Sequence, residues 1–485
     1  MANVNFPTRF IERIKQVLVE KKNQSEFFDR CTAPLPKTVR VVHPKKNLDT
    51  LPKDWTLTPV ADIPSVYFIE RPNQKELALG KTFEHRTGKI YSATLSSLFS
   101  AFVLDAQPEE KVLDLCAAPG SKSTFLAEKI GKEGILVANE LSASRIKKLA
   151  ANMDRLAIAN TVLTQNNGAT MHFFLDQEFD RILVDAPCSS EGFGRKSSAF
   201  FEKQWFEHKI HDCAKLQRQL IVSAFRMLAP GGTMVYSTCT TAPEENELVV
   251  QHLLEEFGDA VELQSIPITE IPHTNGITEF NGTKILAEVQ QKSVRLWPHL
   301  YSDKWDSECF FIVKIKKTEA TQRPPAVKEF SDSLLKKMPK NKMAELIVRW
   351  HKSFGIPRDE FKRLILANKN GEVFLTNSGA LSFAKKNKYQ RVGLKLLDAH
   401  GNITPEFVQR FGVLITKNRV ELTKEQVQKY LDGYDLMLEP SQLDELNVDS
   451  QFQNAVVVKY DGFALGWGKL LKGGKLKNKI DRGLL

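Results

Sequence analysis

The chain has 485 residues, of which 42% are hydrophobic and 26% charged, a globular composition too long for one compact core. Its formal net charge of +10 favours a polyanionic partner such as nucleic acid; the alternative is a basic protein without such a partner. Because no apolar stretch approaches the roughly 20 residues that span a bilayer and no secretory signal is visible, we expect no contact with a membrane.

The cysteine pattern excludes two classes of small domain. The six cysteines form no CxxC pair and no dense cluster, so we expect neither a zinc site nor a disulfide framework, and no other metal. Free thiols fit a reducing compartment, which predicts a cytoplasmic protein. These cysteines are Cys31, Cys116, Cys188, Cys213, Cys239 and Cys309.

The first 108 residues are expected to form an extension of mixed α and β structure. Apolar spacing predicts a helix over Arg9–Glu20 with Thr8 as its N-cap. Two β-branched runs, Thr38–Val42 and Ser65–Ile69, are predicted to be strands.

From 109 to 317 the sequence alternates short apolar runs with amphipathic segments, which is typical of a mostly parallel sheet with helices between its strands. The expected strands are Lys111–Leu115, Gly134–Ala138, Thr161–Leu163, Arg181–Val184, Gly232–Ser237 and Cys309–Ile315. The helices expected between them are Lys122–Ile130, Ser142–Arg155 and Cys213–Leu228. In such a sheet, ligands lie at the carboxyl ends of the strands.

The composition of the remaining sequence changes twice. A polar, proline-containing segment at 318–330 is predicted to be a linker. A small intermediate domain is expected at 331–389, with a helix over Met343–Phe354. From 390 to 485 short β runs predominate, among them Arg391–Leu397 and Ala455–Val458.

Two basic regions are candidate RNA-contacting surfaces. Near the C-terminus, Phe463 and Trp467 alternate with lysines, which suits a groove where charge meets the backbone and rings meet the bases. A lysine-rich tail without a partner is the alternative. The N-terminal region has a second basic cluster, for which an ordinary solvated face is an equal alternative. Its members are Lys37, Arg40, His43, Lys45 and Lys46.

Two cysteines follow predicted strands. Cys188 stands in Asp185-Ala186-Pro187-Cys188, directly after one apolar run, and Cys239 stands in Ser237-Thr238-Cys239 after another. If both strands belong to one parallel sheet, both thiols reach the same rim. This placement predicts covalent catalysis in which the two sulfur atoms have separate roles.

A candidate cofactor site follows the first strand of the sheet. Small residues at 116–121 form a turn into a helix, which lets a ligand approach the backbone closely. The chain has neither a GxxxxGK[ST] nor a GxGxxG motif, so S-adenosylmethionine, which lacks a pyrophosphate, is the expected ligand. Glu140, twenty residues after Gly120, is placed to accept hydrogen bonds from the ribose, and Asn167 lies where an adenine amino group is expected.

These segments resemble the RNA (cytosine-C5) methyltransferases, the family that includes the bacterial RsmF-type 16S ribosomal RNA enzymes and the eukaryotic NOL/NOP/Sun proteins. The matching blocks are CAAPGSKS at 116–123, NELSASR at 139–145, DAPCSSEG at 185–192, and YSTCT with PEENE at 236–247. The C-terminal DGFALGWGKL is similar to the PUA-type module of RsmF-type members.

The resemblance implies a role for each matching residue. Cys239 is the nucleophile that adds to C6 of cytosine, and Cys188 assists release of the methylated product. Asp185 hydrogen-bonds the base, and Lys122 is an active-site lysine whose ammonium is expected to favour the Cys239 thiolate. The residues expected at the cofactor are Cys116, Ala117, Ala118, Pro119, Gly120, Ser121, Lys122, Glu140, Arg145, Asn167 and Asp185.

The implied fold is an α/β, Rossmann-like class I methyltransferase sheet at 109–317, with an α+β RNA-binding extension at 1–108 and a mostly-β PUA-like domain at 390–485. The implied activity is S-adenosylmethionine-dependent methylation of cytosine C5 in ribosomal RNA, of the small subunit, by a monomer. Three alternatives stay open: a tRNA cytosine-C5 methyltransferase, a DNA cytosine-C5 methyltransferase using Cys188 as nucleophile, and a non-catalytic RNA-binding or ribosome-assembly protein.

The sequence departs from the family pattern at a few positions. Asn167 stands where the family usually has aspartate, and its carbonyl can still accept a hydrogen bond. Ala93 and Thr94 replace the usual glutamine and acidic residue, and Cys309 replaces a glycine. These changes lie at the rim of the site, so the chemistry follows more directly from the sequence than the substrate does.

Overall fold

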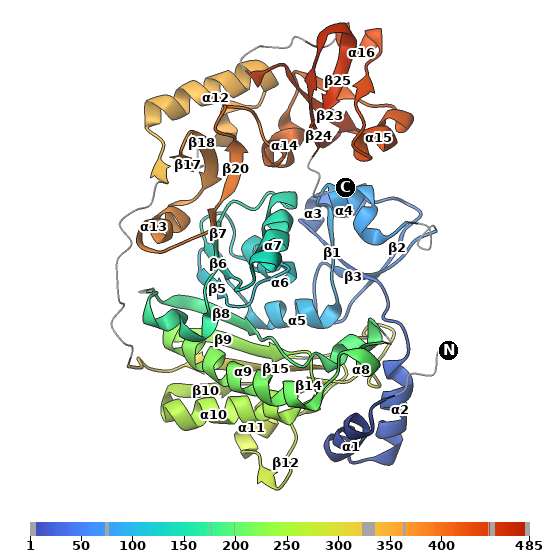
Figure 1. Ribbon diagram of the computed structural model, residues 1–485, viewed down its shortest axis with the longest axis vertical. Helices are drawn as coiled ribbons and strands as arrows, with labels where there is room; N and C mark the ends of the chain where they lie inside the picture. The colour runs from blue at the N-terminus through green and yellow to red at the C-terminus, as the bar shows by residue number, and fades with distance from the viewer. Residues whose placement is uncertain are drawn as a thin grey trace.

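The computed structural model describes residues 6–72, 77–175, 177–197, 199–322, 335–361, 365–444, 446 and 452–480. Figure 1 shows a large central sheet with helices on both faces, an N-terminal region beside it and two smaller sheets above it. None of the described helices is both long and apolar enough to cross a membrane. The proposed linker at 318–330 lies mostly outside the described residues.

The N-terminal region consists of a helical pair and a small antiparallel sheet. The helices α1 (Thr8–Val17) and α2 (Lys21–Cys31) pack through aromatic side chains against Phe200 and Trp205 of the central region. Thr8 is not the N-cap as predicted: Pro7 takes that position without a side-chain bond, and Thr8 lies inside the first turn. The sheet, in the order β2-β3-β1-β4, comprises Thr56–Pro59, Val66–Glu70, Thr38–Val41 and Ile90–Ser92.

The central sheet has ten strands around a parallel core in the order β9-β8-β5-β6-β7. This confirms the predicted Rossmann-like α/β fold, with strand ends that differ from the expected ones by a few residues. Antiparallel strands extend the core on both sides. The core strands are β5 (Lys111–Asp114), β6 (Ile135–Asn139), β7 (Thr161–Thr164), β8 (Phe179–Asp185) and β9 (Leu228–Thr238). The antiparallel ones are β10 (Val261–Gln264), β11 (Thr274–Asn275), β14 (Val294–Leu296), β15 (Phe310–Lys317) and β19 (Arg391–Val392).

Helices bury both faces of the sheet because its strands are apolar on both sides. Val112 faces the cluster formed with α5, α6 and α7, whereas its neighbour Leu113 faces the cluster formed with α9, α10 and α13. Period-two alternation of the strand side chains thus divides the core into two layers. The helices are α5 (Leu95–Leu104), α6 (Ser121–Lys129), α7 (Ala143–Arg155), α9 (Glu207–Met227), α10 (Glu247–Phe257) and α13 (Ser378–Lys386).

The C-terminal part contains two sheets (Figure 1). The first, in the order β16-β17-β18-β20, packs with α12 (Lys340–Phe354) and α14 (Pro405–Phe411). Its strands are Lys336–Lys337, Ile365–Lys369, Glu372–Thr376 and Leu394–Leu397. The second sheet, in the order β21-β23-β24-β25-β22, packs with α15 (Lys424–Leu431). Its strands are Arg419–Glu421, Ala455–Tyr460, Phe463–Leu470, Lys475–Asn478 and Leu436–Met437.

The strand predicted over Arg391–Leu397 is divided between two sheets. Residues 391–392 form β19, which pairs antiparallel with β7 of the central sheet, and residues 394–397 form β20. The break falls at Gly393, whose φ is +60°, and a Cβ there would lie 2.1 Å from the Leu375 carbonyl oxygen. Only glycine fits this turn. Arg391 also forms an ion pair with Asp154 of α7, which fixes the C-terminal part to the central one.

Two side chains proposed to contact RNA, those of Arg40 and Trp467, serve packing instead. Arg40 is 1% exposed and pairs with Glu128 of α6, because it lies on the inward face of β1. Trp467 belongs to the core beneath α12 and α14. Phe463 is half-buried, with the Lys89 ammonium 3.4 Å from its ring centroid. Lys37, His43, Lys45 and Lys46 are exposed, as the predicted RNA-contacting surface requires.

We expect the Arg40→Ala variant to lose about 3 kcal/mol of unfolding free energy, because removing one partner of a buried ion pair leaves the other charge uncompensated. Chemical denaturation followed by circular dichroism measures this loss. Lys45→Ala, at an exposed lysine of the same region, is the matched control and is expected to change stability by less than about 0.5 kcal/mol. Equal stability of the two variants would show that Arg40 does not fix the N-terminal sheet to α6.

Candidate active site

The loop between β5 and α6 makes a tight turn at the rim of the sheet, close against α7. Gly120 has a φ of +111°, and a Cβ at this position would lie 3.0 Å from Leu149 Cδ1. The first turn of α6 begins at Ser121 and offers N–H groups that the helix itself does not use. The Ser121 hydroxyl is buried and has no hydrogen-bond partner in the described part of the chain. An orphaned donor in this loop fits a polar ligand.

Glu140 and Arg145 complete this side of the rim. Glu140 is 4% exposed and accepts a hydrogen bond of 2.9 Å from the Ser142 backbone N–H. The Arg145 guanidinium lies 3.4 Å from Glu140 and donates to the Ala118 carbonyl at 2.6 Å, so it joins the loop to the acid. Asn167 is exposed, and its side-chain oxygen accepts from the Ala169 N–H at 3.1 Å. The predicted cofactor residues therefore gather at one rim.

Sequence reasoning missed Asn139, the residue that holds the ends of three strands together. Its amide donates to the carbonyl oxygens of Leu115 at 3.1 Å and Asn166 at 3.0 Å. Its side-chain oxygen accepts from the Thr164 hydroxyl at 2.9 Å. An asparagine at the end of a predicted strand, directly before the acid at 140, was the available signal.

Lys122 and Asp185 form an ion pair inside the site. The Lys122 ammonium lies 2.7 Å from Asp185 Oδ2 and donates to the Ser97 hydroxyl at 3.0 Å. The Ser237 hydroxyl donates to Asp185 Oδ1 at 2.9 Å. Asp185 is thus held at both oxygens while 28% of its side chain stays exposed, so it can still accept a hydrogen bond from a ligand.

The side chains of Cys188 and Cys239, the two predicted site cysteines, are in contact. The Cys188 and Cys239 sulfur atoms are 3.3 Å apart, although 51 residues separate them in the chain. Their strands β8 and β9 are parallel neighbours, which places the two loops at the same rim. The Cys188 thiol donates to the Cys239 sulfur, and this bond lowers the pKa of Cys239 and raises that of Cys188.

Cys239 differs from every other cysteine of the chain in the direction of its pKa. Burial raises the pKa of Cys213 to about 11 and that of Cys31 to about 12. Burial also raises the pKa of Cys116 and Cys309. A thiolate is the nucleophilic form of cysteine, so this contrast makes Cys239 the candidate for the reactive thiol.

The cation that helps Cys239 is Lys196, which the sequence analysis did not single out. Its positive charge lowers the pKa of Cys239, in addition to the larger effect of the Cys188 hydrogen bond and against the larger raising effects of burial and of the Asp185 charge. The Lys196 ammonium is held 3.0 Å from the buried carboxylate of Glu308. Sequence reasoning assigned this influence to Lys122, whose charge is instead paired with Asp185.

Two buried carboxylates brace the cysteine loops. Glu245 accepts from the Ser189 N–H at 3.0 Å and from the Gln217 amide at 2.8 Å, and that amide also donates to the Pro187 carbonyl. Glu191, from the first loop, accepts from the Thr241 N–H in the second at 2.9 Å. Neither glutamate was predicted as a site residue, although both stand in the matching blocks.

Comparisons with known proteins agree with this geometry. A family model described as 16S rRNA methyltransferase RsmB/F matches residues 101–316, and a model of the methyltransferase RsmF PUA domain matches 417–485. The ribosomal RNA small subunit methyltransferase F of Vibrio parahaemolyticus is 33% identical over 100% of this chain and 98% of its own length. The chain belongs to the RsmB/F methyltransferase family. The resemblance inferred from the sequence blocks is thereby confirmed.

Two further relatives support this membership. The RsmB/F-family protein named ribosomal RNA small subunit methyltransferase F in Escherichia coli is 33% identical over 99% of this chain and 97% of its own length. A crystal structure of a methyltransferase homologue from Pyrococcus horikoshii is 29% identical, with a TM-score of 0.55, and covers 65% of this chain and 96% of that one.

Glu245 makes stability depend on pH. Burial raises its pKa from 4.5 to about 7, so between these values the folded state holds a proton that the unfolded chain releases. Stability therefore falls as pH rises through this window. We expect Glu245→Gln, which keeps the shape of the side chain, to reduce the loss between pH 5 and pH 8 by about 2–3 kcal/mol. Chemical denaturation at pH 5 and pH 8 measures the loss of stability in the wild type and in the variant. Glu288→Gln, at an exposed glutamate, is the control. An unreduced loss in Glu245→Gln would contradict the assignment.

Lys196 is expected to control the reactivity of Cys239. In Lys196→Gln the ammonium is lost, the pKa of Cys239 rises, and alkylation by iodoacetamide at neutral pH slows. The rate at Cys239, followed by mass spectrometry across a pH series, gives the pH of half-maximal reactivity, which moves upward. Lys203→Gln, at an exposed lysine nearby, is expected to leave the pH of half-maximal reactivity unchanged. The same profile in both variants would remove Lys196 from the site.

Proposed function

We propose that this protein transfers a methyl group from S-adenosylmethionine to C5 of a cytosine in small-subunit ribosomal RNA, with Cys239 as the nucleophile. The observation that carries the proposal is the pair of contacting sulfurs, in which one thiol has a lowered pKa and the other a raised one. Cytosine C5 is a weak nucleophile until a thiolate adds to C6, and two thiols with different protonation states suit the two steps that follow.

The residues around the sulfurs support each step. The Cys239 thiolate adds to C6, and Asp185, fixed by Lys122 and Ser237, hydrogen-bonds the base and stabilises the adduct. After C5 is methylated, its proton leaves, the Cys239–C6 bond breaks, and the adjacent Cys188 thiol assists this release. Because the base must leave its stack to reach the sulfurs, the RNA is locally opened at a cost of roughly a few kcal/mol.

The residues at the rim fit S-adenosylmethionine. This cofactor, when bound, supplies the methyl group as a sulfonium. The orphaned Ser121 hydroxyl gives an unused polar group at the start of α6, and buried Glu140 accepts hydrogen bonds from ribose hydroxyls. Asn167 offers the remaining lone pair of its side-chain oxygen to an amino group such as that of adenine.

The assignment to ribosomal RNA rests on the named relatives and on the charge of +10. The six free thiols suit the cytoplasm, where ribosomes are assembled. We also propose that the chain divides into domains at residues 108, 317, 330 and 389. The protein is proposed to act as a monomer.

The three alternatives differ from this proposal in which cysteine is the nucleophile, in whether the protein is catalytic, or in which nucleic acid is the substrate. A DNA-type enzyme would use Cys188, whose raised pKa disfavours the thiolate. A non-catalytic assembly protein has no need for a sulfur pair braced by two buried glutamates. A tRNA enzyme would share the site, so the substrate must be measured.

Bisulfite sequencing of cellular RNA with and without the protein tests the activity. We expect one or a few cytosines of 16S ribosomal RNA to lose protection when the protein is absent. Expression of the wild type is expected to restore protection, and Cys239→Ala is expected to restore none. If the 16S pattern is unchanged and the tRNA pattern changes, the substrate is tRNA and not 16S ribosomal RNA.

The roles of the sulfurs are separated in vitro. We expect Cys188→Ala to accumulate a covalent RNA complex that shifts on a denaturing gel, and Cys239→Ala to form none while still binding S-adenosylmethionine in calorimetry. The exposed-surface variant Lys284→Ala is the control. An adduct in Cys239→Ala and none in Cys188→Ala would reverse the assignment.

A further inference from the structure

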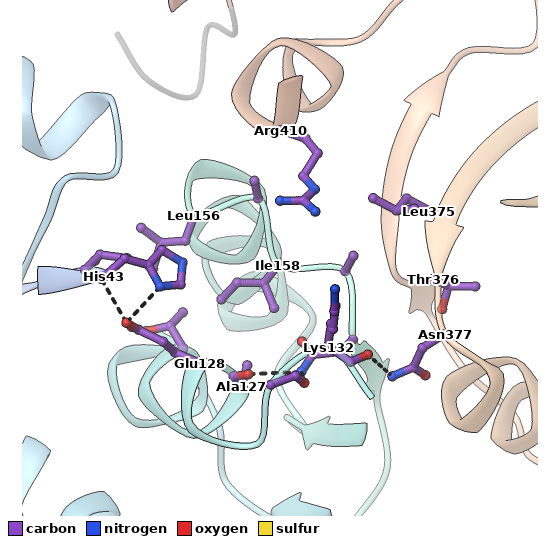
Figure 2. A pocket seen from close by; sticks show the side chains of 16 residues that line it. His43, Ala127, Glu128, Lys132, Leu156, Ile158, Leu375, Thr376, Asn377 and Arg410 are labelled. Carbon is purple, nitrogen blue, oxygen red and sulfur yellow. Dashed lines mark hydrogen bonds and ion pairs between the residues drawn. The ribbon is translucent and has the colours of Figure 1, made fainter. Parts of the chain in front are cut away.

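A cavity lies where the N-terminal, central and C-terminal parts meet, away from the sulfur pair. Its volume is about 160 Å³, and it lies between the end of α6, the start of β7 and the strand β18 with α14 (Figure 2). A second cavity of about 170 Å³ shares five lining residues with it, so the two form one groove. We call it the junction groove. The shared residues are Val42, His43, Leu156, Ala157 and Arg410.

Two cations face each other across the junction groove. Figure 2 shows Arg410 reaching down from α14 and Lys132 reaching up from the end of α6 into the same space. Within the described residues neither side chain has a hydrogen bond or an ion pair. Glu128, the one acid among the lining residues described, is already engaged by Arg40 and His43. Burial lowers the pKa of Arg410, against a smaller opposing effect of Glu360, which does not line the groove.

The second cavity extends the positive charge. Lys46, Lys89 and Arg155 line it. Lys89 and Arg155 are each 5% exposed and donate to the Thr50 and His85 carbonyl oxygens, and the charges of Glu84 and Asp461 act on Lys89. The exposed cations are Lys46 in this cavity and Arg410 and Lys132 in the first, and exposed positive charge along a groove attracts a chain of anions spaced along a backbone.

A buried hydroxyl and apolar side chains complete the groove. Thr376 is 4% exposed, and its Oγ1 has no hydrogen-bond partner in the part of the chain that the structure describes. It is therefore a buried polar group with an unmet hydrogen bond at the wall of the groove. Ile158 lies between the two cations, and Leu156 and Leu375 lie on either side of it (Figure 2). Charge, one hydroxyl and an apolar surface together suit a nucleotide, with its phosphate, ribose and base face.

We propose that the junction groove binds a segment of the substrate RNA backbone outside the active site, with a phosphate between Arg410 and Lys132. The proposal rests on RNA being the substrate of this protein. RNA is favoured over a free nucleotide because the positive charge continues from one cavity into the next, which a single phosphate does not require. The N-terminal, central and C-terminal parts of the chain then bind the same RNA strand. The groove contributes to the affinity for RNA and not to the chemical step.

The test uses the full chain with Lys132→Gln and Arg410→Gln combined. The matched control combines Lys284→Gln and Arg218→Gln, which removes the same charge at exposed positions outside the groove. The ligand is 16S ribosomal RNA from cells that lack the protein. We expect the KM for this RNA to rise about tenfold with kcat unchanged, and the slope of log K against log salt to fall in magnitude by about 0.7 for one lost phosphate contact. The control is expected to match the wild type.

Each result decides the proposal. If the groove variant and the control have the same KM and the same salt slope, the groove does not bind RNA. If AMP or inorganic phosphate binds the wild type and not the groove variant while RNA affinity is unchanged, the site takes a small anion and the proposal is overturned. The salt slope comes from binding alone, so it reports on the groove even if the methylated base is not cytosine. Thermal melting of both variants controls for folding.

Discussion

The contact between two sulfur atoms depends on the parallel pairing of β8 and β9. This pairing brings residues 188 and 239 to one rim, and the two sulfur atoms lie 3.3 Å apart. Glu191 and Glu245 link the two loops, together with the bond from the Gly192 N–H to the Cys239 carbonyl and the bond between the Ser189 and Thr240 hydroxyls. Burying these carboxyl groups is costly unless their oxygens accept hydrogen bonds, and the Ser189 and Thr241 N–H groups and the Gln217 amide donate to them. The helices on the two faces of the sheet, in turn, keep water from these bonds.

Charge in the site is arranged in separate pairs. Lys122 is matched to Asp185 and Lys196 to Glu308, so each cation has its own acid. The two pairs still act on one another, because the Asp185 charge raises the pKa of Cys239 while the Lys196 charge lowers it.

The sequence predicted the sheet and the rim residues because both are encoded locally. Apolar strands followed by short motifs give the positions of Cys188, Cys239 and Glu140 without knowledge of distant contacts. The errors concern partners far along the chain. Arg40 resembles a surface cation until Glu128, 88 residues away, is known to bind it. Likewise Trp467 becomes a core residue only when α12 and α14 cover it, and Lys196 matters only beside the second cysteine loop.

The short strand β19 has a consequence for how the enzyme finds its base. Since residues 391–392 complete an edge of the central sheet and Gly393 turns the chain directly into the next sheet, the C-terminal part is not free to swing on a tether. The backbone itself therefore sets how far the first C-terminal sheet lies from the sulfur pair. RNA bound by that part of the chain would be held at a set separation from the two sulfur atoms.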